Sequence, residues 1–305
     1  MTIRLLLCVL LAGCAGLPAL FNSSQVDTLG AQRGTRGTSD GKKSEMLLYV
    51  PDETLVRVYS YPRGKLVGTL KQNMWSDGLC TNPVNGDVYL VEVFSIVVYA
   101  HGGKYPTKTL DYPGSGANSC AIDPRSGNLA VTDSGTPAEV YVYRNASGTP
   151  KLYSGFPGMH VAADCVYDDG GSLYVTGDDI SVAFRLDEIA KSGTLSTIRF
   201  GTTKTSLNPF AGVQWDGKHI ILSDGGQNLY QFEISRHRGM LAGQAVLDDS
   251  TNVYGMWLQG NRILVPNDDQ GGHVRIYDYP AGGKPIKTLT GFQLPYGAAV
   301  SEPRS

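Results

Sequence analysis

Short apolar runs alternate with turn residues along most of the chain, and no long stretch shows the periodicity of an amphipathic helix. Segment 118–153 is representative. Its apolar runs cover residues 119–122, 129–132, 140–143 and 152–153, separated by turns rich in Asp, Pro, Ser, Gly and Asn. Short runs that are rich in β-branched and aromatic residues predict strands. The segment therefore predicts an antiparallel meander of four strands.

Versions of this segment recur at spacings of 40 to 48 residues through to the C-terminus. A carboxylate closes the second predicted strand of each unit, at Asp52, Glu92, Asp133, Asp178, Asp224 and Asp268. An aromatic residue closes the third predicted strand, at Tyr59, Tyr99, Tyr143, Phe184, Phe232 and Tyr277. The fourth predicted strands end near Leu70, Leu110, Tyr153, Phe200, Leu247 and Leu289. The repeat therefore indicates six similar units.

The repeat begins and ends out of phase with its units. Residues 46–50 match a second strand without a first strand before them, and residues 296–300 match a first strand without a second strand after them. Pairing of these two segments would complete one unit and remove the open edges of a ring. The sequence therefore predicts an all-β fold over residues 46–305. This fold is a six-bladed β-propeller of four-stranded antiparallel blades, closed by the N-terminal strands pairing with the C-terminal strand.

Residues 1–13 predict export. Arg4 precedes an apolar run shorter than the roughly 20 residues that span a bilayer, and this run ends at Leu-Ala-Gly-Cys14. The pattern resembles a bacterial lipoprotein signal peptide, cleaved before an acylated Cys14; an ordinary signal peptide with an incidental cysteine is the alternative. Since Ala15 follows the cysteine, we expect an anchor in the cell envelope, on the outer membrane if the host has one. Residues 14–45, rich in Ser, Gly and Thr, are predicted to be a flexible tether.

The charge of the chain is nearly balanced, with 26 Lys and Arg against 28 Asp and Glu. This balance gives no electrostatic footprint for nucleic acid. Contact with a membrane is expected only through the lipid anchor. The expected partner is therefore a small molecule or an envelope protein.

Three cysteines follow the signal segment: Cys80, Cys120 and Cys165. Cys120 and Cys165 occupy the same place in successive repeats, so we expect them to lie near each other. The favoured interpretation is that all three are buried free thiols on inner strands, since free cysteine is among the most buried residue types. Pairing of Cys120 with Cys165 stays open. No CxxC pair or Cys/His cluster suggests zinc.

The DP-x-x-G-N-L-x-V-T-D and V-x-V-Y patterns resemble six-bladed propellers of the NHL-repeat, gluconolactonase/regucalcin and TolB-like group. The nearest resemblance is to uncharacterised secreted bacterial members, and it covers residues 46–301. The lactonase branch implies a divalent cation held by a Glu, an Asn and an Asp at the starts of inner strands. Asn118 matches the Asn, but Ser119 stands where a Gly is expected, and no inner strand here begins with the Glu.

The loops that lead into the first strands carry most of the candidate chemistry, because these strands line the channel of a propeller. The candidate ligand-binding residues are Trp75, Asp77, Asn118, His160, Asp164, Phe210, Tyr254 and Tyr296. Aromatic faces suit stacking, and carboxylates bind hydroxyls or calcium, so these residues would suit a sugar-like or cationic small ligand. In the competing interpretation the recurring carboxylates bind turn amides and the aromatic residues wedge between blades.

The weakest candidate is a divalent-cation site, such as calcium, formed by Asp77, Asn118 and Asp164. No catalytic residue is predicted, because no histidine is paired with a plausible nucleophile and no G-x-S-x-G motif or phosphate loop occurs. We therefore expect a non-catalytic ligand- or protein-binding module. The alternatives are a metal-dependent lactonase or hydrolase of the gluconolactonase type and a scaffold in an envelope complex.

Overall fold

The computed structural model describes residues 45–303, except 73–75, 202–206, 211, 252, 254 and 268–270, and only the backbone of residues 76 and 77. The predicted signal peptide and most of the predicted tether lie outside the described residues, as do Cys14, Trp75, Tyr254, Asp268 and the Asp77 side chain. Within the described residues, no helix is long and apolar enough to cross a membrane.

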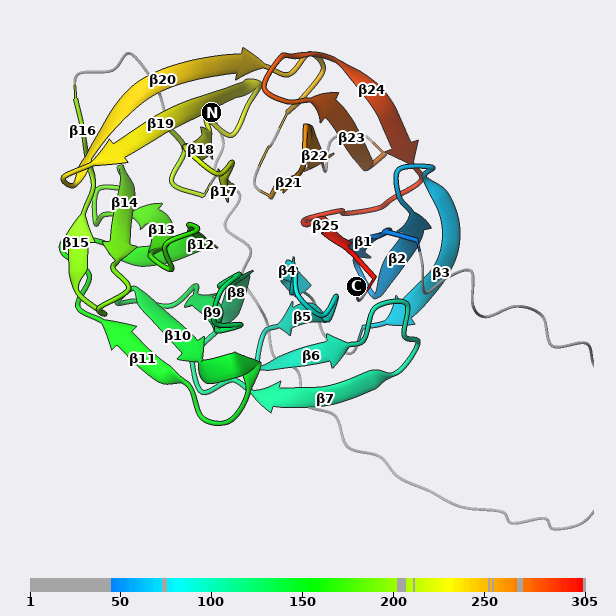
Figure 1. Ribbon diagram of the computed structural model, residues 1–305, viewed down its shortest axis with the longest axis horizontal. Coiled ribbons are helices and arrows are strands. Elements are labelled where there is room, and N and C mark those ends of the chain that lie inside the picture. Colours follow the sequence, from blue (N-terminus) through cyan, green and yellow to red (C-terminus); the bar gives the residue numbers. More distant parts are fainter. Residues whose placement is uncertain are drawn as a thin grey trace, which may run out of the picture. The chain divides into compact units, whose positions relative to one another are not determined.

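The strands of the described residues form six sheets, each with four antiparallel strands, which Figure 1 shows as the blades of a ring; one sheet has a fifth strand that pairs in parallel. The inner strands of blades 1 to 6 are β25 (Ala299–Ser301), β4 (Ser76–Thr81), β8 (Ala117–Ile122), β12 (Val161–Tyr167), β17 (Val213–Trp215) and β21 (Trp257–Gln259). The second strands are β1 (Leu47–Asp52), β5 (Val88–Glu92), β9 (Leu129–Asp133), β13 (Leu173–Asp178), β18 (Ile220–Ser223) and β22 (Arg262–Asn267). The six-bladed β-propeller predicted from the repeat is confirmed.

The remaining strands lie toward the outside of the ring. The third strands are β2 (Leu55–Ser60), β6 (Ser95–Tyr99), β10 (Glu139–Tyr143), β14 (Phe184–Ile189), β19 (Asn228–Ser235) and β23 (His273–Asp278). The fourth strands are β3 (Lys65–Lys71), β7 (Pro106–Asp111), β11 (Lys151–Ser154), β15 (Leu195–Thr197), β20 (Arg238–Val246) and β24 (Gly282–Thr290). A single 3-10 turn, η2 (Arg144–Ala146), follows β10 among the described residues.

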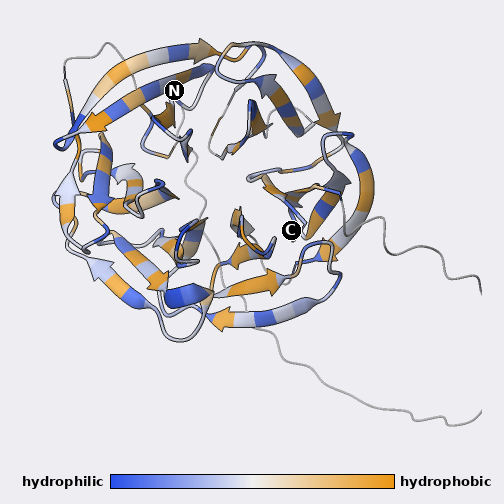
Figure 2. Cartoon of the chain, viewed as in Figure 1, coloured by the Kyte–Doolittle hydropathy of each residue, from blue (hydrophilic) through white to orange (hydrophobic). Residues whose placement is uncertain are grey.

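The burial of a strand depends on its position in the blade. The second strands are buried along their whole length, as β5 and β9 show, apart from the partly buried Arg262 that begins β22, because both of their faces pack against neighbouring blades. The fourth strand β7 buries only Leu110, and Figure 2 shows hydrophobic and hydrophilic residues alternating along the outermost strands. The hydrophobic core is therefore a set of apolar layers between blades.

The ring closes as the phase of the repeat predicted. In blade 1, β1 pairs with β25, with Leu47 opposite Ser301 and Tyr49 opposite Ala299. The strand order of this sheet is β25-β1-β2-β3. The two ends of the propeller domain thus complete one blade, and neither end leaves an open sheet edge.

The aromatic residue that closes the third strand joins one blade to the one before it. The hydroxyl group of Tyr99 donates to the Lys71 carbonyl oxygen over 3.1 Å, and that of Tyr143 donates to the Asp111 carbonyl oxygen over 2.7 Å. Both acceptors lie at the end of the fourth strand of the preceding blade. The recurrence of this aromatic residue therefore has a structural cause.

The carboxylate that closes the second strand holds the loop before the inner strand of its own blade. Asp133 accepts hydrogen bonds from the hydroxyl groups of Tyr112 and Ser115 and from the backbone amides of Ser115, Gly116 and Gly135. Asp52 accepts from the Gln293 and Leu294 amides, just before β25. Burial alone would raise the pKa of Asp133, but these hydrogen bonds hold it below its usual value. The structure thus supports the structural interpretation for these two carboxylates.

Two predicted strand ends in blade 4 are wrong. Phe184 begins β14 rather than ending a third strand, because Asp179 folds residues 179–183 into a longer turn by accepting from the Ser181 and Ala183 amides. Phe200 does not end the fourth strand. It lies in β16 (Arg199–Phe200), which pairs in parallel with β20 of the next blade, and its ring packs edge-on against Phe232 at 4.7 Å.

Candidate functional site

The six inner strands surround two cavities, one at each mouth of the channel. We call the face where the inner strands begin the N-face, and the face where they end the C-face. The N-face cavity has a volume of about 250 Å³ and the C-face cavity about 270 Å³. Along β8, for example, Asn118 and Ser119 line the N-face cavity and Ala121 and Ile122 line the C-face cavity. The two cavities therefore belong to opposite mouths.

Four residues line both cavities: Cys120, Cys165, Gln214 and Trp257. Trp257 is the largest of them, and it packs against three separate core clusters, from the interfaces of blades 2 with 3, 1 with 2, and 6 with 1. Its indole nitrogen donates to the Gln259 side chain over 3.1 Å. Trp257 therefore lies across the channel and separates the two cavities.

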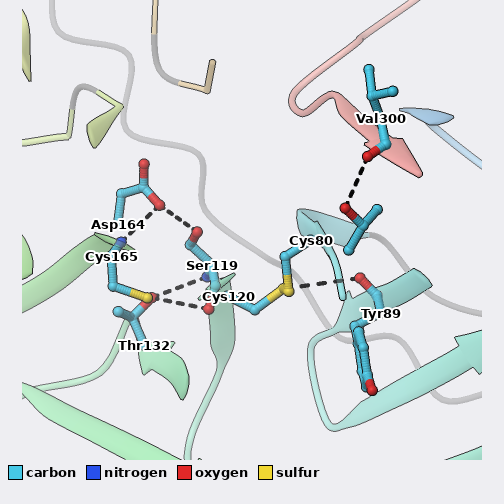
Figure 3. Close-up of a disulfide and its surroundings, with 9 residues drawn as sticks. Cys80, Tyr89, Ser119, Cys120, Thr132, Asp164, Cys165 and Val300 are labelled. Atoms are coloured by element: carbon cyan, nitrogen blue, oxygen red, sulfur yellow. Dashed lines mark hydrogen bonds between the residues drawn. A yellow bond between two sulfur atoms is a disulfide. The ribbon is translucent and has the colours of Figure 1, made fainter. Parts of the chain in front are cut away.

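A disulfide joins the inner strands of blades 2 and 3 (Figure 3). Cys80 of β4 pairs with Cys120 of β8, with their Cα atoms 5.7 Å apart, while Cys165 is a buried free thiol. A Cβ atom on Gly78 would lie 2.3 Å from the Asn118 carbonyl oxygen, so only glycine permits this approach of β4 to β8. The interpretation of Cys80 and Cys120 as free thiols is wrong, because neighbouring inner strands run side by side at bonding distance. A disulfide between Cys120 and Cys165, which was left open as an alternative, does not form.

Polar side chains link the inner strands of blades 3, 4 and 5 at the N-face cavity. The Asn118 amide donates to the Ala163 carbonyl oxygen over 2.7 Å. The Ser119 hydroxyl group donates to Asp164 over 2.5 Å, as Figure 3 shows. The second oxygen of Asp164 accepts from the Val213 amide over 2.9 Å. Burial has the largest effect on Asp164 and raises its pKa, although these donors act in the opposite direction.

Similar links continue around the ring, one or more at each blade interface. Going around the channel, the links are Thr81 to Val300, the disulfide, Asn118 to Ala163, Asp164 to Val213, Gln214 to Met256, and Gln259 to Glu302. A buried polar group is costly unless it finds a partner, so the buried link from Thr81 to Val300 also satisfies a desolvated hydroxyl group, whereas the link from Gln259 to Glu302 is exposed. The channel wall is therefore tied together all the way round.

The structure brings together four of the predicted ligand residues. Asn118, Asp164, Phe210 and Tyr296 all line the N-face cavity. His160 is exposed and lies outside the lining of both cavities. Its backbone amide donates to the Asp178 carbonyl oxygen.

The sequence reasoning missed Gln214 and Trp257, which lie inside inner strands. The loops before these strands predicted residues at the mouth of the N-face cavity but not the inner-strand residues deeper in the channel. The available signal was the position of Trp257 three residues after Tyr254, inside the predicted first strand.

The predicted cation site cannot be assembled from the described side chains. Within them, no group of three or more His, Cys, Asp or Glu residues could hold a metal ion. Both oxygens of Asp164 already accept hydrogen bonds from the protein, and the Asn118 amide is committed to Ala163. Because the Asp77 side chain lies outside the description, calcium binding stays a prediction.

The N-face cavity offers aromatic and apolar contact with a few fixed polar groups. Phe210, Met256, Trp257 and Tyr296 supply the apolar and aromatic surface, and Ser119 and Asp164 supply polar atoms. Such a lining suits stacking and hydrogen bonding to a small ligand.

Comparisons with known proteins support the fold alone. No family model matches the chain, and no curated protein matches it significantly. Among solved structures, the chain resembles one from a nidogen/laminin complex, at 15% identity and a TM-score of 0.69, over 85% of this chain and 100% of that one. A Bacteroides caccae protein of unknown function gives 13% identity and a TM-score of 0.65, over 85% and 99%. A chain of Kuenenia stuttgartiensis hydrazine synthase gives 18% identity and a TM-score of 0.57, over 82% and 80%. The class is therefore the six-bladed β-propeller, a fold that does not by itself define a function.

Proposed function

We propose that this protein is an exported lipoprotein, anchored to the cell envelope through Cys14, whose propeller binds a ligand through its N-face without catalysing a reaction. The observation that carries the binding role is the N-face cavity, with its aromatic lining and few polar groups. Its volume of about 250 Å³ suits a ligand of monosaccharide size. The motif ending at Cys14 supports the anchor. Membership of the NHL-repeat and TolB-like group is part of the same proposal.

The surroundings of this cavity support a contact surface. Phe210 at its rim is 42% exposed, and the β5–β6 loop on the same face exposes Phe94. The β13–β14 loop, also on this face, exposes Ile180 and Val182 at 87% and 62%. Scattered single apolar residues need no explanation, but several on the loops of one face favour a contact surface there.

The β13–β14 loop is held in one conformation. Asp179 accepts from the Ser181 hydroxyl group, from the Ala183 and Ser181 amides, and from the Arg185 guanidinium at 2.6 Å, and these donors hold its pKa well below the usual value. Val182 has a φ of 62°, which is rare for a β-branched residue and is typical of functional loops. The loop therefore presents its apolar side chains without a large loss of entropy on binding.

Thermal unfolding with a panel of neutral monosaccharides tests the ligand site. At ten times its dissociation constant, a bound sugar stabilises the protein by about 1.4 kcal/mol, which raises Tm by about 3 °C. We expect Phe210→Ala to abolish that shift and Tyr105→Ala to preserve it, since Tyr105 is exposed in the β6–β7 loop of the opposite face. A panel without any shift would contradict a sugar-like ligand. A shift with calcium alone would favour the metal-dependent hydrolase.

Membrane fractionation of cells that produce the full chain tests the anchor. Wild-type protein should be recovered with membranes, and Cys14→Ser should move it to the soluble fraction, because without the thiol the diacylglyceryl anchor cannot be attached. Cys8→Ser is the matched control, since Cys8 lies within the predicted signal peptide. Continued membrane association of Cys14→Ser contradicts the lipoprotein assignment and leaves the ligand site untouched.

A further inference from the structure

A loop of blade 2 contacts both ends of the propeller domain. His101 lies in the β6–β7 loop, and its Nε2 atom is 3.0 Å from the carbonyl oxygen of Glu45, two residues before β1. Its Nδ1 atom is 2.7 Å from the hydroxyl oxygen of Ser301, the last residue of β25. The next amide in the loop, that of Gly102, donates to the Tyr49 hydroxyl group of β1 over 2.9 Å. One imidazole ring therefore joins the start of β1 to the end of β25, where the ring of blades closes.

A tight turn of blade 2 completes this cluster. The hydroxyl oxygen of Ser301 lies 2.6 Å from the carbonyl oxygen of Gly86, in the β4–β5 turn. Gly86 has a φ of 74°, and a Cβ atom there would lie 2.2 Å from the Glu302 carbonyl oxygen and 3.1 Å from the Cβ atom of His101. Only glycine therefore permits this turn to approach β25 so closely. Ser301 is fully buried and His101 is partly buried.

The neutral form of His101 cannot satisfy every contact of the cluster at once. A carbonyl oxygen only accepts, so the Nε2 atom beside Glu45 carries a hydrogen. The Nδ1 atom of the neutral ring is then an acceptor, and it takes the single hydrogen of the Ser301 hydroxyl group away from Gly86. A protonated ring donates from Nδ1 as well, and the Ser301 hydrogen then turns to the Gly86 carbonyl oxygen. The protonation state of His101 therefore decides which way the Ser301 hydroxyl group donates.

The protonated ring makes one more hydrogen bond but places a charge in a poorly hydrated position. The ion pairs of the described residues do not include His101. Burial has the largest effect on this ring and lowers the pKa of His101, opposed by the hydrogen bond to the Glu45 carbonyl oxygen. The folded protein therefore binds this proton less tightly than the unfolded chain does.

The charged and titratable groups around the ring have other partners or belong to its own loop. They are Glu45 before β1, Tyr49 in β1, Asp87 in the β4–β5 turn, Glu302 after β25, and Lys104 in the β6–β7 loop. The Glu45 carboxylate pairs with Arg63, Asp87 accepts from the Asn85 amide, and Glu302 accepts from the Gln259 amide. The three carboxylates on the neighbouring elements are thus engaged elsewhere.

We propose that His101 is a pH-sensitive latch on the closure of the ring, held by its neutral form and weakened by its protonation. In the neutral form, Nε2 donates to Glu45 and Nδ1 accepts from Ser301, so both ends of the domain are held by one side chain. A protonated ring regains its hydration only when the β6–β7 loop separates from these two segments. Since β25 is only three residues long, few backbone hydrogen bonds hold it to β1. The propeller therefore opens at blade 1 more readily in acid than at neutral pH.

Long-range ¹H–¹⁵N NMR correlation of the imidazole nitrogens tests the latch directly. The protein is the full chain carrying Cys14→Ser, so that no lipid is attached, and the histidine signals are assigned through their backbone resonances. We expect the Nε2–H tautomer of His101 at pH 7.5 and a titration midpoint below the ordinary value of 6.5. An Nδ1–H tautomer, or a midpoint at or above 6.5, overturns the proposal without any change at His101.

Urea unfolding tests the effect on stability. In the same Cys14→Ser background, His101→Gln keeps one donor and one acceptor but does not ionise. A group whose pKa is lowered by folding stabilises the protein above its unfolded pKa, and this stabilisation is lost as the pH falls through the folded value. Between pH 7.5 and pH 5, the urea midpoint of the parent should therefore fall relative to that of His101→Gln. A difference that stays constant, or that moves in favour of the parent in acid, overturns the proposal. His160→Gln, at an exposed histidine outside the closure, is the matched control and should keep the pH dependence of the parent.

Hydrogen exchange followed by mass spectrometry locates the effect. After correction for the intrinsic pH dependence of exchange, peptides from β1 and β25 should exchange faster at pH 5 than at pH 7.5 in the parent but not in His101→Gln. Peptides from β13, in blade 4, should show no such change. Faster exchange in acid that is spread evenly over all six blades would assign the pH effect to global unfolding and overturn the latch.

Discussion

The two cavities have similar volumes and are built by the same six strands, yet their polar groups are used differently. In the N-face cavity, Asn118, Ser119 and Asp164 are committed to neighbouring inner strands. In the C-face cavity, the Trp215 indole N–H has no partner among the described residues, and Asp169 and Glu302 face solvent. The N-face cavity is a structural junction with an aromatic rim. The C-face cavity has two exposed carboxylates in its lining, and one of them, Glu302, accepts a hydrogen bond from Gln259.

The difference shows that the repeat sets where a residue lies in its blade but not which contacts its side chain makes. Asn118 and Ala121 lie on one strand, but the first donates a hydrogen bond to the next blade, while the second packs in the apolar cluster between blades 3 and 4 and lines the C-face cavity. Side chains that hold blades together should affect stability when they are replaced, and side chains left uncommitted should affect binding. The predictions below test this division, beginning with the largest effect.

Removal of the disulfide should have the largest effect, because it ties the strands from which both cavities are built. For a sequence separation of 40 residues, loss of the cross-link between Cys80 and Cys120 costs about 4 kcal/mol in the chain-entropy model. Urea unfolding of the double variant Cys80→Ser, Cys120→Ser measures this loss. Cys165→Ser is the control, since this thiol is unpaired, and it should cost clearly less. Equal losses in the two variants would contradict a structural role for the cross-link.

Removal of the Trp257 side chain should join the two cavities. Trp257→Ala deletes a partly buried ring that packs against three core clusters, and we expect a loss of about 3 kcal/mol in the free energy of unfolding. Trp257→Phe keeps a ring in the channel and should lose less. If the two variants have equal stability, the ring does not form the partition between the cavities.

Asp133→Asn should destabilise the N-face loop in a pH-dependent way. The variant loses charge-assisted hydrogen bonds, and we expect a cost of about 2 kcal/mol at pH 7. The pKa of Asp133 is lower in the folded protein than its ordinary value of 3.8, so its stabilisation is complete above that pH and is lost as the pH falls through the folded value. Unfolding measured at pH 7 and pH 3 should show the deficit shrinking in acid. Asp169→Asn, at the exposed rim of the C-face cavity, should change stability by less than about 0.5 kcal/mol.

Asp164→Asn should show the opposite dependence on pH and the smallest effect. Burial raises the pKa of Asp164 above 3.8, so the folded protein binds its proton more tightly than the unfolded chain does. Wild-type stability from this group is therefore greatest below the unfolded pKa and decreases as the pH rises through the folded value. The asparagine variant lacks this decrease. Urea unfolding at several pH values between 4 and 8 measures the free energy of unfolding of both proteins. The value for wild type minus the value for Asp164→Asn should fall as the pH rises. A difference that rises with pH would contradict the burial of this carboxylate.

Much of the architecture was predictable because it repeats. The Asp133 and Tyr143 positions gave the blade period, and the out-of-phase segments 46–50 and 296–300 gave the closure that β1 and β25 make. Blade 4 was predicted least well, because the turn at Asp179 and the strand at Phe200 depart from the repeat. Local sequence signals fail at such departures since neighbouring blades, not the segment itself, decide the pairing.

The site was predicted only in part. Four of the predicted ligand-binding residues, Asn118, Asp164, Phe210 and Tyr296, line one cavity, and whether they bind a ligand stays a prediction. The same reasoning placed His160 with them, but its side chain is exposed and lines neither cavity. Which way a loop residue points depends on contacts from other blades, and these contacts are separated from it by 40 or more residues of chain.

The sequence by itself determined the strands, the number of blades and the closure of the ring, because alternation, turn residues and repeat length are local properties of the chain. Only the tertiary structure decided which side chains meet. It paired Cys80 with Cys120 and left Cys165 free, committed Asp164 to two neighbouring strands, and left the Trp215 indole N–H without an acceptor among the described residues. The physical reason is that partners in the channel come from different blades, so their distance depends on how closely the inner strands approach around the ring.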